Sequence, residues 1–341
     1  MTRLVVSPVG RAVSIVLLFG VASIASVVVA VAVGSVALSA TDLLHALPAA
    51  LSGSPVDLHS TLLKLRLDRA LLAWVTGSSL ALAGVMMQAL LRNPLADPYV
   101  LGISGGASVG ALLAMLLSAA VWQIDLAALL GAVTVTVLLL GLVRGDLRSA
   151  NGQTPVLLLT GVILSAGCGA LVTLMLSIAP DNQIRSMIFW LVGDVSATEL
   201  RLMPWLVLAA AWAFCWRQAR ALNILAMYGD LASTMGVAVN RLRLFLFLWA
   251  AALTASAVTN AGSIGFLGLI VPHACRFALG PDHRLLLPVA ALSGGMILVL
   301  ADTLARTIVA PQQLPVGVIT ALIGVPVFLL QLQQLRRRGH T

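Results

Sequence analysis

One short segment places a serine among glycines in a pattern that could support covalent catalysis. Gly102-Ile103-Ser104-Gly105 matches the Gly-x-Ser-Gly of intramembrane serine proteases, and His273 could act as the general base from a later helix. Four residues with two glycines arise easily in a glycine-rich chain, and a helix that starts after Pro98 explains them as caps and packing contacts. An intramembrane protease is therefore a remote alternative, and we assign no catalytic residue.

A second polar segment interrupts an apolar stretch. The segment begins with charged residues at 65–69 and continues with an uncharged run. It ends with Arg92-Asn93-Pro94-Leu95-Ala96-Asp97-Pro98. The two prolines stop a helix, and the Asn and Asp beside them supply hydrogen-bonding groups. The segment therefore predicts a membrane helix that ends in a rigid polar turn, of the kind that lines a pathway or touches a partner.

The chain lacks the groups that would let it drive transport alone. Lys64 is its only lysine, and no Gly-x-x-x-x-Gly precedes it, so the sequence has no phosphate-binding loop for ATP. Its long apolar runs contain none of the intramembrane carboxylates expected of a proton- or sodium-coupled carrier. Asp302 lies one turn from Arg306, near a predicted helix end. We therefore expect another subunit to supply the energy, with an ATP-independent carrier or channel as the rival class.

Composition places the chain among polytopic membrane proteins. Of its 341 residues, 60% are hydrophobic and 9% are charged, and uncharged runs long enough to cross a bilayer recur. Segment 244–275 is too long for one crossing, and the polar residues 260–263 divide it into two short helices. The sequence predicts one all-α transmembrane domain over residues 1–341 with ten spans: 12–38, 70–91, 99–121, 126–143, 154–179, 202–216, 285–301, 316–332 and two within 244–275.

The charge pattern orients the chain and excludes other classes. Ten spans with a cytoplasmic N-terminus place most basic residues, and the C-terminus, in the cytoplasm. The net charge of +8 therefore reflects topology, and no loop is large enough to form a nucleic-acid-binding face. The three cysteines, Cys168, Cys215 and Cys275, are too few and too irregularly spaced for a disulfide framework or a metal site.

Several motifs in fixed order support a resemblance to a known family. The first half contains Leu65-Arg66-Leu67-x-Arg69, the run 92–98 and Leu101-Gly102-Ile103-Ser104-Gly105-Gly106. The second half contains the runs 262–273, 280–284, 301–306 and 314–317. From about residue 65 to the C-terminus, the chain resembles the permease subunits of type II ABC importers for iron chelates and cobalamin. Segment 12–38 matches that family by hydropathy alone.

The resemblance implies a homodimer in the bacterial inner membrane, with the pathway at the dimer interface. Two ATPase subunits would bind the cytoplasmic face and hold ATP and Mg, a periplasmic binding protein would deliver the substrate, and this chain would carry no cofactor. Carried over by position, one cytoplasmic gate consists of Asn93 and Leu95 and the other of Gln153 and Thr154. The alternative for Asn93 is that it caps the turn at Pro94.

The resemblance also implies an ATPase-coupling loop at residues 222–243, with a short amphipathic helix that Gly236 ends. Its contact residues would be Met227, Asp230, Leu231, Ala232, Met235 and Gly236. The chain departs from the family at Tyr228 and Ser233, where glycine and arginine are usual, which alters the charge pairing with the ATPase.

On the outer face, Arg66, Arg69 and Arg306 align with arginines that receive acidic residues of the binding protein. The alternative is that they anchor helix ends at the lipid headgroups. Asp68 replaces a proline that is usual in the family, which is expected to loosen the turn there and to neutralise part of the patch.

The substrate is the least determined feature. We expect a ferric siderophore or haem first and cobalamin second. Candidate pathway residues are Met86, Met87, Gln88 and Met175, although methionines also fill ordinary cores.

Overall fold

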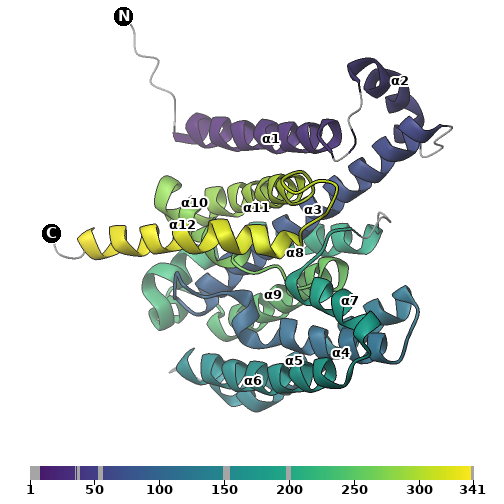
Figure 1. Ribbon diagram of the computed structural model, residues 1–341. Helices are drawn as coiled ribbons and strands as arrows, with labels where there is room; N and C mark the ends of the chain where they lie inside the picture. Colours follow the sequence, from purple (N-terminus) through teal and green to yellow (C-terminus); the bar gives the residue numbers. More distant parts are fainter. Residues whose placement is uncertain are drawn as a thin grey trace, which may run out of the picture.

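The computed structural model describes residues 8–34, 36, 39–52, 57–148, 154–196 and 201–338. All regular elements in these ranges are helices (Figure 1). They are α1 (Pro8–Ala32), α2 (Ala40–Leu51), α3 (Leu58–Leu90), η1 (Pro98–Leu101), α4 (Ile103–Leu116), α5 (Val121–Arg148), α6 (Thr154–Ile178), α7 (Asp181–Val192), α8 (Leu202–Tyr228), η2 (Gly229–Ser233), α9 (Val239–Ala261), α10 (Leu267–Leu279), α11 (His283–Ala305) and α12 (Val316–Arg338).

The helices agree with the predicted polytopic membrane protein. Among the described residues, stretches of α1, α3, α5, α6, α9 and α11 are long and apolar enough to cross a bilayer, and α4, α10 and α12 contain shorter apolar helices. The predicted break in segment 244–275 is confirmed, because α9 ends at Ala261 and α10 begins at Leu267. The short helices α2 and α7 were not predicted, and the ten-span count stays a prediction.

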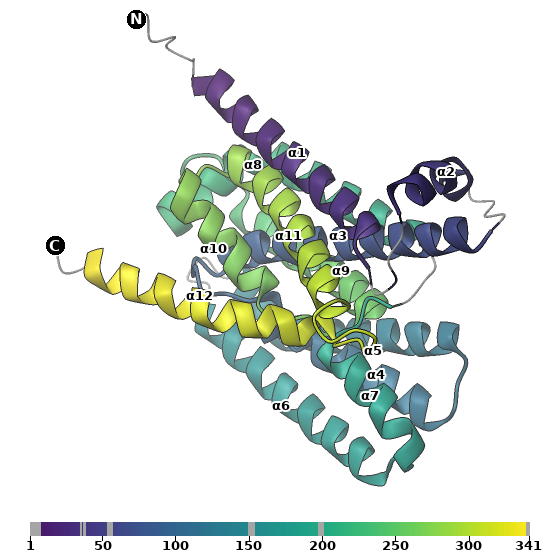
Figure 2. The same ribbon diagram turned by 45° about the horizontal axis from the view of Figure 1, so that its top comes forward.

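The helix α3 lies at the centre of the bundle. Its apolar window is 89% buried, whereas the windows of α1 and α6 are each 17% buried and expose apolar side chains to lipid or to another subunit. The two views place α1 along one side, α3 and α11 inside, and α4, α5 and α6 along the other side (Figure 2).

Small residues let α3 approach its neighbour closely. Gly77 of α3 faces Gly294 of α11 so tightly that a Cβ on either glycine would overlap the other backbone. Ser78 Oγ also donates to the carbonyl oxygen of Ala291 at 2.8 Å. The expected close packing around Gly106 is confirmed as well, because Gly106 of α4 lies directly against Gly131 of α5.

Candidate functional site

The polar turn after α3 is confirmed and is built by two side-chain caps. Asn93 Oδ1 accepts a hydrogen bond from Leu95 N at 2.9 Å, and Asp97 Oδ1 accepts one from Tyr99 N at 2.8 Å to begin η1. Arg92 adopts a left-handed conformation with φ +48°, which turns the chain sharply away from α3. Asn93 therefore has the capping role, and Leu95 stays 40% exposed at the tip of the turn.

The structure brings together one of the two predicted gates. Asn93 and Leu95 share the turn after α3. Gln153 lies outside the described residues, and Thr154 is described as the first residue of α6 without a placed side chain. The gate roles of these four residues stay predictions.

Asp97 makes the stability of the turn depend on pH. Burial raises the pKa of Asp97 from 3.8 to about 6, against the lowering effect of the hydrogen bond from Tyr99 N. Because the folded chain binds this proton more tightly than the unfolded chain does, stability should fall as pH rises from about 4 to about 6. Asp97→Asn keeps the Oδ1 acceptor without the charge, so it should flatten that dependence and melt no lower than the parent at pH 7. Thermal unfolding across this pH range tests both outcomes, and a parent stability that rises from pH 4 to 6 contradicts the assignment.

The predicted coupling loop extends α8 and then turns sharply. Helix α8 runs to Tyr228, and Gly229 follows at φ +58° and begins the 3-10 helix η2. Gly236 ends the turn at φ +84°. The expected short helix is present only as the 3-10 helix η2, which ends at Ser233 and not at Gly236.

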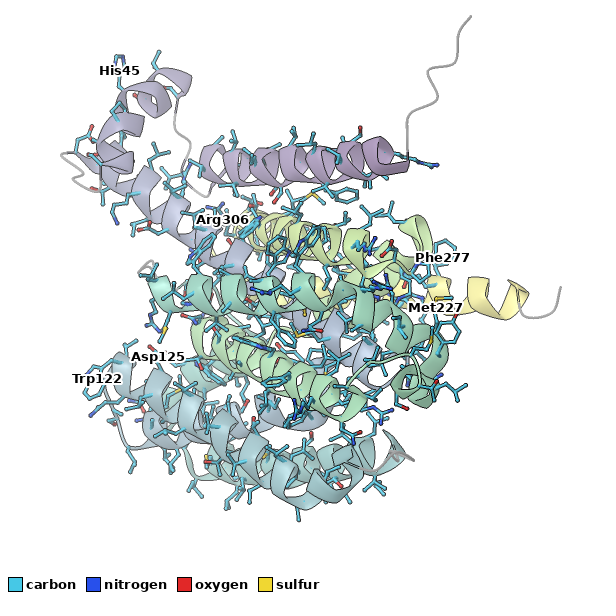
Figure 3. The ribbon with its side chains drawn as sticks, turned by 180° about the vertical axis from the view of Figure 1, so that it is seen from behind. His45, Trp122, Asp125, Met227, Phe277 and Arg306 are labelled. Carbon is cyan, nitrogen blue, oxygen red and sulfur yellow. The ribbon has the colours of Figure 1, made fainter. Side chains whose placement is uncertain are left out.

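The coupling loop presents an exposed apolar patch. Met227, Leu231 and Met235 are 70%, 66% and 51% exposed, and Met227 lies at one end of the bundle (Figure 3). Such a patch is typical of a surface that contacts another protein. Ala232 differs from these three residues, because its side chain is fully buried within the chain. The structure describes no side chain for Asp230.

A direct contact joins the coupling loop to the polar turn. The guanidinium of Arg92 lies against Gly229, in the space that a Cβ on Gly229 would occupy. The loop that carries the apolar patch thus touches the turn that carries Asn93 and Leu95.

Gly229→Ala should damage this junction. The new Cβ would overlap the Arg92 guanidinium, and φ +58° with ψ −124° is strained for any L side chain, at a cost of about 1–3 kcal/mol. Gly236→Ala is the matched control, because it also has a positive φ but no atom within 4 Å of the added Cβ. Limited proteolysis of the loop should be faster in Gly229→Ala than in Gly236→Ala. Equal cleavage of the two variants would show that the contact with Arg92 is unimportant.

The three arginines predicted to dock a binding protein are engaged inside the chain. Arg66 donates to the carbonyl oxygens of Val31 and Ala32, each at 3.2 Å, and Arg306 donates to that of Ala30. These are carbonyl groups at the end of α1, which have no partner within the helix. Arg66 and Arg306 are 7% and 5% exposed, so in this structure they fasten α1 to the bundle and do not reach the lipid headgroups.

Arg69 of α3 forms an ion pair with Asp302 of α11. Its Nε lies 3.0 Å from both carboxylate oxygens of Asp302, and its Nη2 lies 2.8 Å from Oδ1. The Arg69 and Asp302 side chains are 12% and 2% exposed. The expected turn at Asp68 is wrong, because Asp68 lies within α3 and pairs with Lys64 at 2.8 Å instead of neutralising the arginines.

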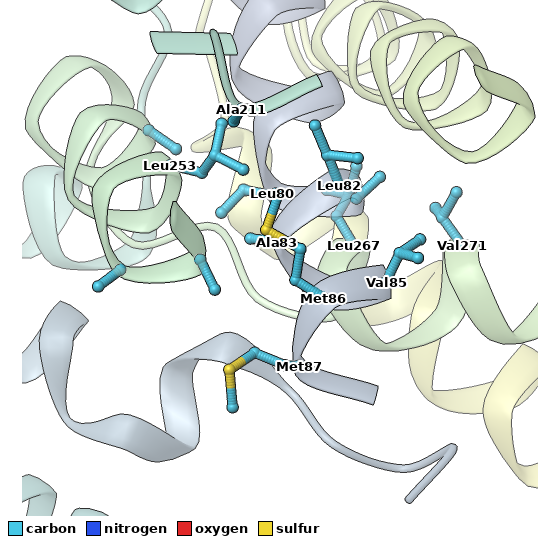
Figure 4. Packing of buried hydrophobic residues seen from close by; sticks show 14 of the residues in the cluster. Leu80, Leu82, Ala83, Val85, Met86, Met87, Ala211, Leu253, Leu267 and Val271 are labelled. Carbon is cyan, nitrogen blue, oxygen red and sulfur yellow. The ribbon is translucent and has the colours of Figure 1, made fainter. Parts of the chain in front are cut away.

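The candidate pathway residues on α3 pack in the protomer core. Met86 and Met87 are fully buried (Figure 4). Gln88 Nε2 donates to the carbonyl oxygen of Leu269 at 3.1 Å. Met175 is partly buried against the same cluster. In this conformation close-packed neighbours fill the space around the three α3 residues, and the pathway roles of all four residues stay predictions.

The serine protease geometry is not assembled. Ser104 Oγ lies 2.9 Å from Ser263 Oγ, whereas both ring nitrogens of His273 lack a hydrogen-bond partner among the described residues. His273 lies inside α10. A nucleophile and base would need to contact each other.

A cavity of about 1000 Å³ lies at the opposite end of α8 from the coupling loop. Its wall includes an ion pair between Arg201 and Asp125 at 2.6 Å, and Arg185 lies over the ring of Phe189 at 5.7 Å. Figure 3 shows Trp122 and Asp125 together, far from Met227. Sequence reasoning missed this cavity, because its lining residues are scattered between residues 115 and 313 and form no linear motif.

The fold and these sites define a membrane permease, and comparison with known proteins identifies its family. The FecCD transport family matches residues 21–334, and the chain belongs to that family. The resemblance drawn from the sequence motifs is therefore confirmed.

Curated relatives agree with this assignment. The hemin transport system permease protein HmuU of Yersinia pestis is 40% identical over 292 residues, covering 81% of this chain and 84% of the relative. The cobalamin import system permease protein BtuC of Halobacterium salinarum is 42% identical over 282 residues, covering 81% and 74%. An uncharacterized ABC transporter permease, YvrB of Bacillus subtilis, is 38% identical over 287 residues, covering 82% and 80%.

Solved structures share the architecture. A metal-chelate type ABC transporter in an inward-facing conformation matches with a TM-score of 0.82 at 27% identity, covering 94% of this chain and 99% of the other. PsaBC from Streptococcus pneumoniae, solved with a Fab, matches with a TM-score of 0.52 at 18% identity, covering 77% and 90%, and this likeness concerns the fold alone.

Proposed function

We propose that this chain is the permease subunit of an ATP-driven importer that moves an iron chelate, a ferric siderophore or haem, from the periplasm to the cytoplasm. It would act in the bacterial inner membrane as a homodimer of ten-span protomers, with both termini in the cytoplasm and the pathway between the protomers. The family match over residues 21–334 carries this proposal. The chain itself is a transport subunit and not an enzyme.

The coupling loop supports an ATPase partner. Its apolar patch at Met227, Leu231 and Met235 lies at the end of a long helix and has no cover within the described chain. An exposed apolar patch of this kind suits a protein contact. Its link through Arg92 to the turn with Asn93 and Leu95 would let movement of the ATPase reach a gate.

The cavity at the other end supports a bulky conjugated chelate as the substrate. In the proposed orientation it opens toward the periplasm, where a binding protein would release its cargo. Trp122 and Phe189 offer flat aromatic surfaces, and Arg185 offers a cation for an acidic group of the chelate. Haem and many ferric chelates combine these features.

Cobalamin is the second candidate. The relative named for cobalamin import is 42% identical, against 40% for the relative named for hemin transport, so the two substrates have similar support.

Native mass spectrometry of the gently purified, tagged chain tests the assembly. Two copies of this chain with two copies of an ATPase are expected, and a bound ligand's mass would then distinguish haem from cobalamin. A chain that is reproducibly alone, under conditions that preserve known transporter complexes, would favour an ATP-independent carrier or channel and contradict the proposal.

A further inference from the structure

The turn between α10 and α11 contains Gly280-Pro281-Asp282-His283-Arg284, a motif to which the proposed function gives no task. In the structure, one side chain of α8 holds this turn. Asn223 Nδ2 donates to Asp282 Oδ1 at 2.7 Å, and Asn223 Oδ1 accepts from His283 N at 2.9 Å and lies 2.8 Å from His283 Nδ1. We call these three residues the clasp.

The clasp joins two helix ends that matter for coupling. Asn223 lies just over one turn before Tyr228, where α8 passes into the exposed loop. Asp282 is the N-cap of α11 and accepts from Arg284 N at 2.9 Å through the same Oδ1 atom. Burial alone would raise the pKa of Asp282, but the hydrogen bonds from Arg284 N and Asn223 lower it, so the carboxylate is ionised and accepts strongly.

From the clasp, α11 runs through the centre of the bundle to its other end. It packs closely on α3 where Gly294 meets Gly77. Near its far end Asp302 holds Arg69 of α3, and Arg306 holds the end of α1. Figure 3 shows the two ends, with Phe277 and Met227 on one side and Arg306 toward the other. A displacement of the α11 N-terminus would therefore reach α3 at Gly77 and at Arg69.

We propose that Asn223 is a positioning residue that fastens the stem of the coupling loop to α11, so that ATPase movement acts on α11 as well as on the turn after α3. This inference rests on the proposed function, because it needs an ATPase partner to move the loop. Asparagine suits the task because its amide supplies the donor for Asp282 and the acceptor for His283 at once.

The chemistry of the clasp gives a set of isosteric variants. Asn223→Asp keeps the shape and the acceptor but loses the donor and places a second carboxylate against Asp282. Asp282→Asn keeps the Oδ1 acceptor that both of its hydrogen bonds use, so it is the matched control. The double variant Asn223→Asp with Asp282→Asn again pairs an amide donor with an acceptor, but it loses the cap on Arg284 N, because Asp282 Oδ1 serves both bonds in the parent.

The first experiment measures the clasp directly by spin-label distances. Ala226→Cys and Arg284→Cys place labels at exposed positions on its two sides, and the three native cysteines are buried and protected from labelling. The purified permease in nanodiscs should give a narrow distance distribution with the native clasp. Asn223→Asp should broaden or shift that distribution, and Asp282→Asn should not. An unchanged distribution in Asn223→Asp overturns the clasp whether or not an ATPase partner exists.

The second experiment measures the ratio of uptake to ATP hydrolysis in proteoliposomes that contain the permease and its ATPase, with the binding protein supplied on the outer side. A labelled ferric siderophore, labelled haem and labelled cobalamin serve as the three transport probes. We expect Asn223→Asp to lower uptake about tenfold while hydrolysis stays within about twofold of the parent, and we expect the double variant to recover part of the uptake. An uptake per ATP equal to the parent in Asn223→Asp overturns the positioning role. Failure of the parent to bind an ATPase or to take up any of the three probes contradicts the proposed function instead.

Discussion

Asp302→Ala should destabilise the protein more than any other single substitution of a charged residue considered for this chain. The carboxylate is 2% exposed and holds the Arg69 guanidinium through three contacts of 2.8–3.0 Å. Arg306 Nε also lies 3.7 Å from the same carboxylate. Removing one partner of a buried ion pair leaves the other charge buried without compensation, which costs about 3–5 kcal/mol.

Thermal unfolding with a thiol-reactive dye measures this loss. The described structure buries Cys168, Cys215 and Cys275, so the dye signal should rise when the bundle opens. Asp125→Ala is the matched control, because Asp125 also pairs with an arginine, Arg201, at 2.6 Å, but with more exposed side chains. We expect the control to cost about 1 kcal/mol or less.

A double replacement separates the unpaired charge from the lost packing. Asp302→Leu with Arg69→Met removes both partners and fills a similar volume, so it should recover much of the stability that Asp302→Ala loses. Equal melting temperatures for Asp302→Ala and Asp125→Ala would show that the Arg69 ion pair is not an important constraint on the bundle.

The sequence predicts the elements that local chemistry determines. Uncharged runs of sufficient length predicted the apolar helices, because a bilayer needs about 20 apolar residues per crossing. The prolines at 94 and 98 predicted the turn after α3, and the polar residues 260–263 predicted the break between α9 and α10. Each of these signals acts over a few neighbouring residues, so it can be read without knowing the rest of the fold.

Other features depend on distant partners and could not be read in that way. The charges at residues 65–69 suggested an exposed entrance, but α3 starts earlier, at Leu58, where Asp57 is the N-cap and forms a capping box with Ser60. Arg69 is buried because Asp302 lies against it, and Arg66 is buried because the end of α1 does. Nothing in the local sequence distinguishes a methionine that packs in a core from one that lines a pathway. The burial of these side chains depends on which helix packs against which face of α3, and the composition of a segment does not contain that information.

The second large effect concerns the coupling loop, where Leu231→Arg should weaken ATPase binding without destabilising the permease. Leu231 is 66% exposed at the centre of the patch, so an arginine there costs the isolated chain little. Against an apolar partner surface, the same charge would be buried without a counterion. We expect the ATPase to bind at least about tenfold more weakly, the loss typical of a central interface residue.

Two neighbouring positions make the experiment specific. Ala232→Arg places the same side chain at a fully buried position, so it should lower the melting temperature as well as the ATPase affinity. Ser233→Arg restores the residue usual in the family at an exposed position and should leave both nearly unchanged or tighten binding. Co-purification of the ATPase with each tagged variant and the melting temperature of each permease together distinguish the three. If Leu231→Arg retains the ATPase as well as Ser233→Arg does, the apolar patch is not the ATPase contact, and the exposed side chains of Met227 and Met235 need another partner.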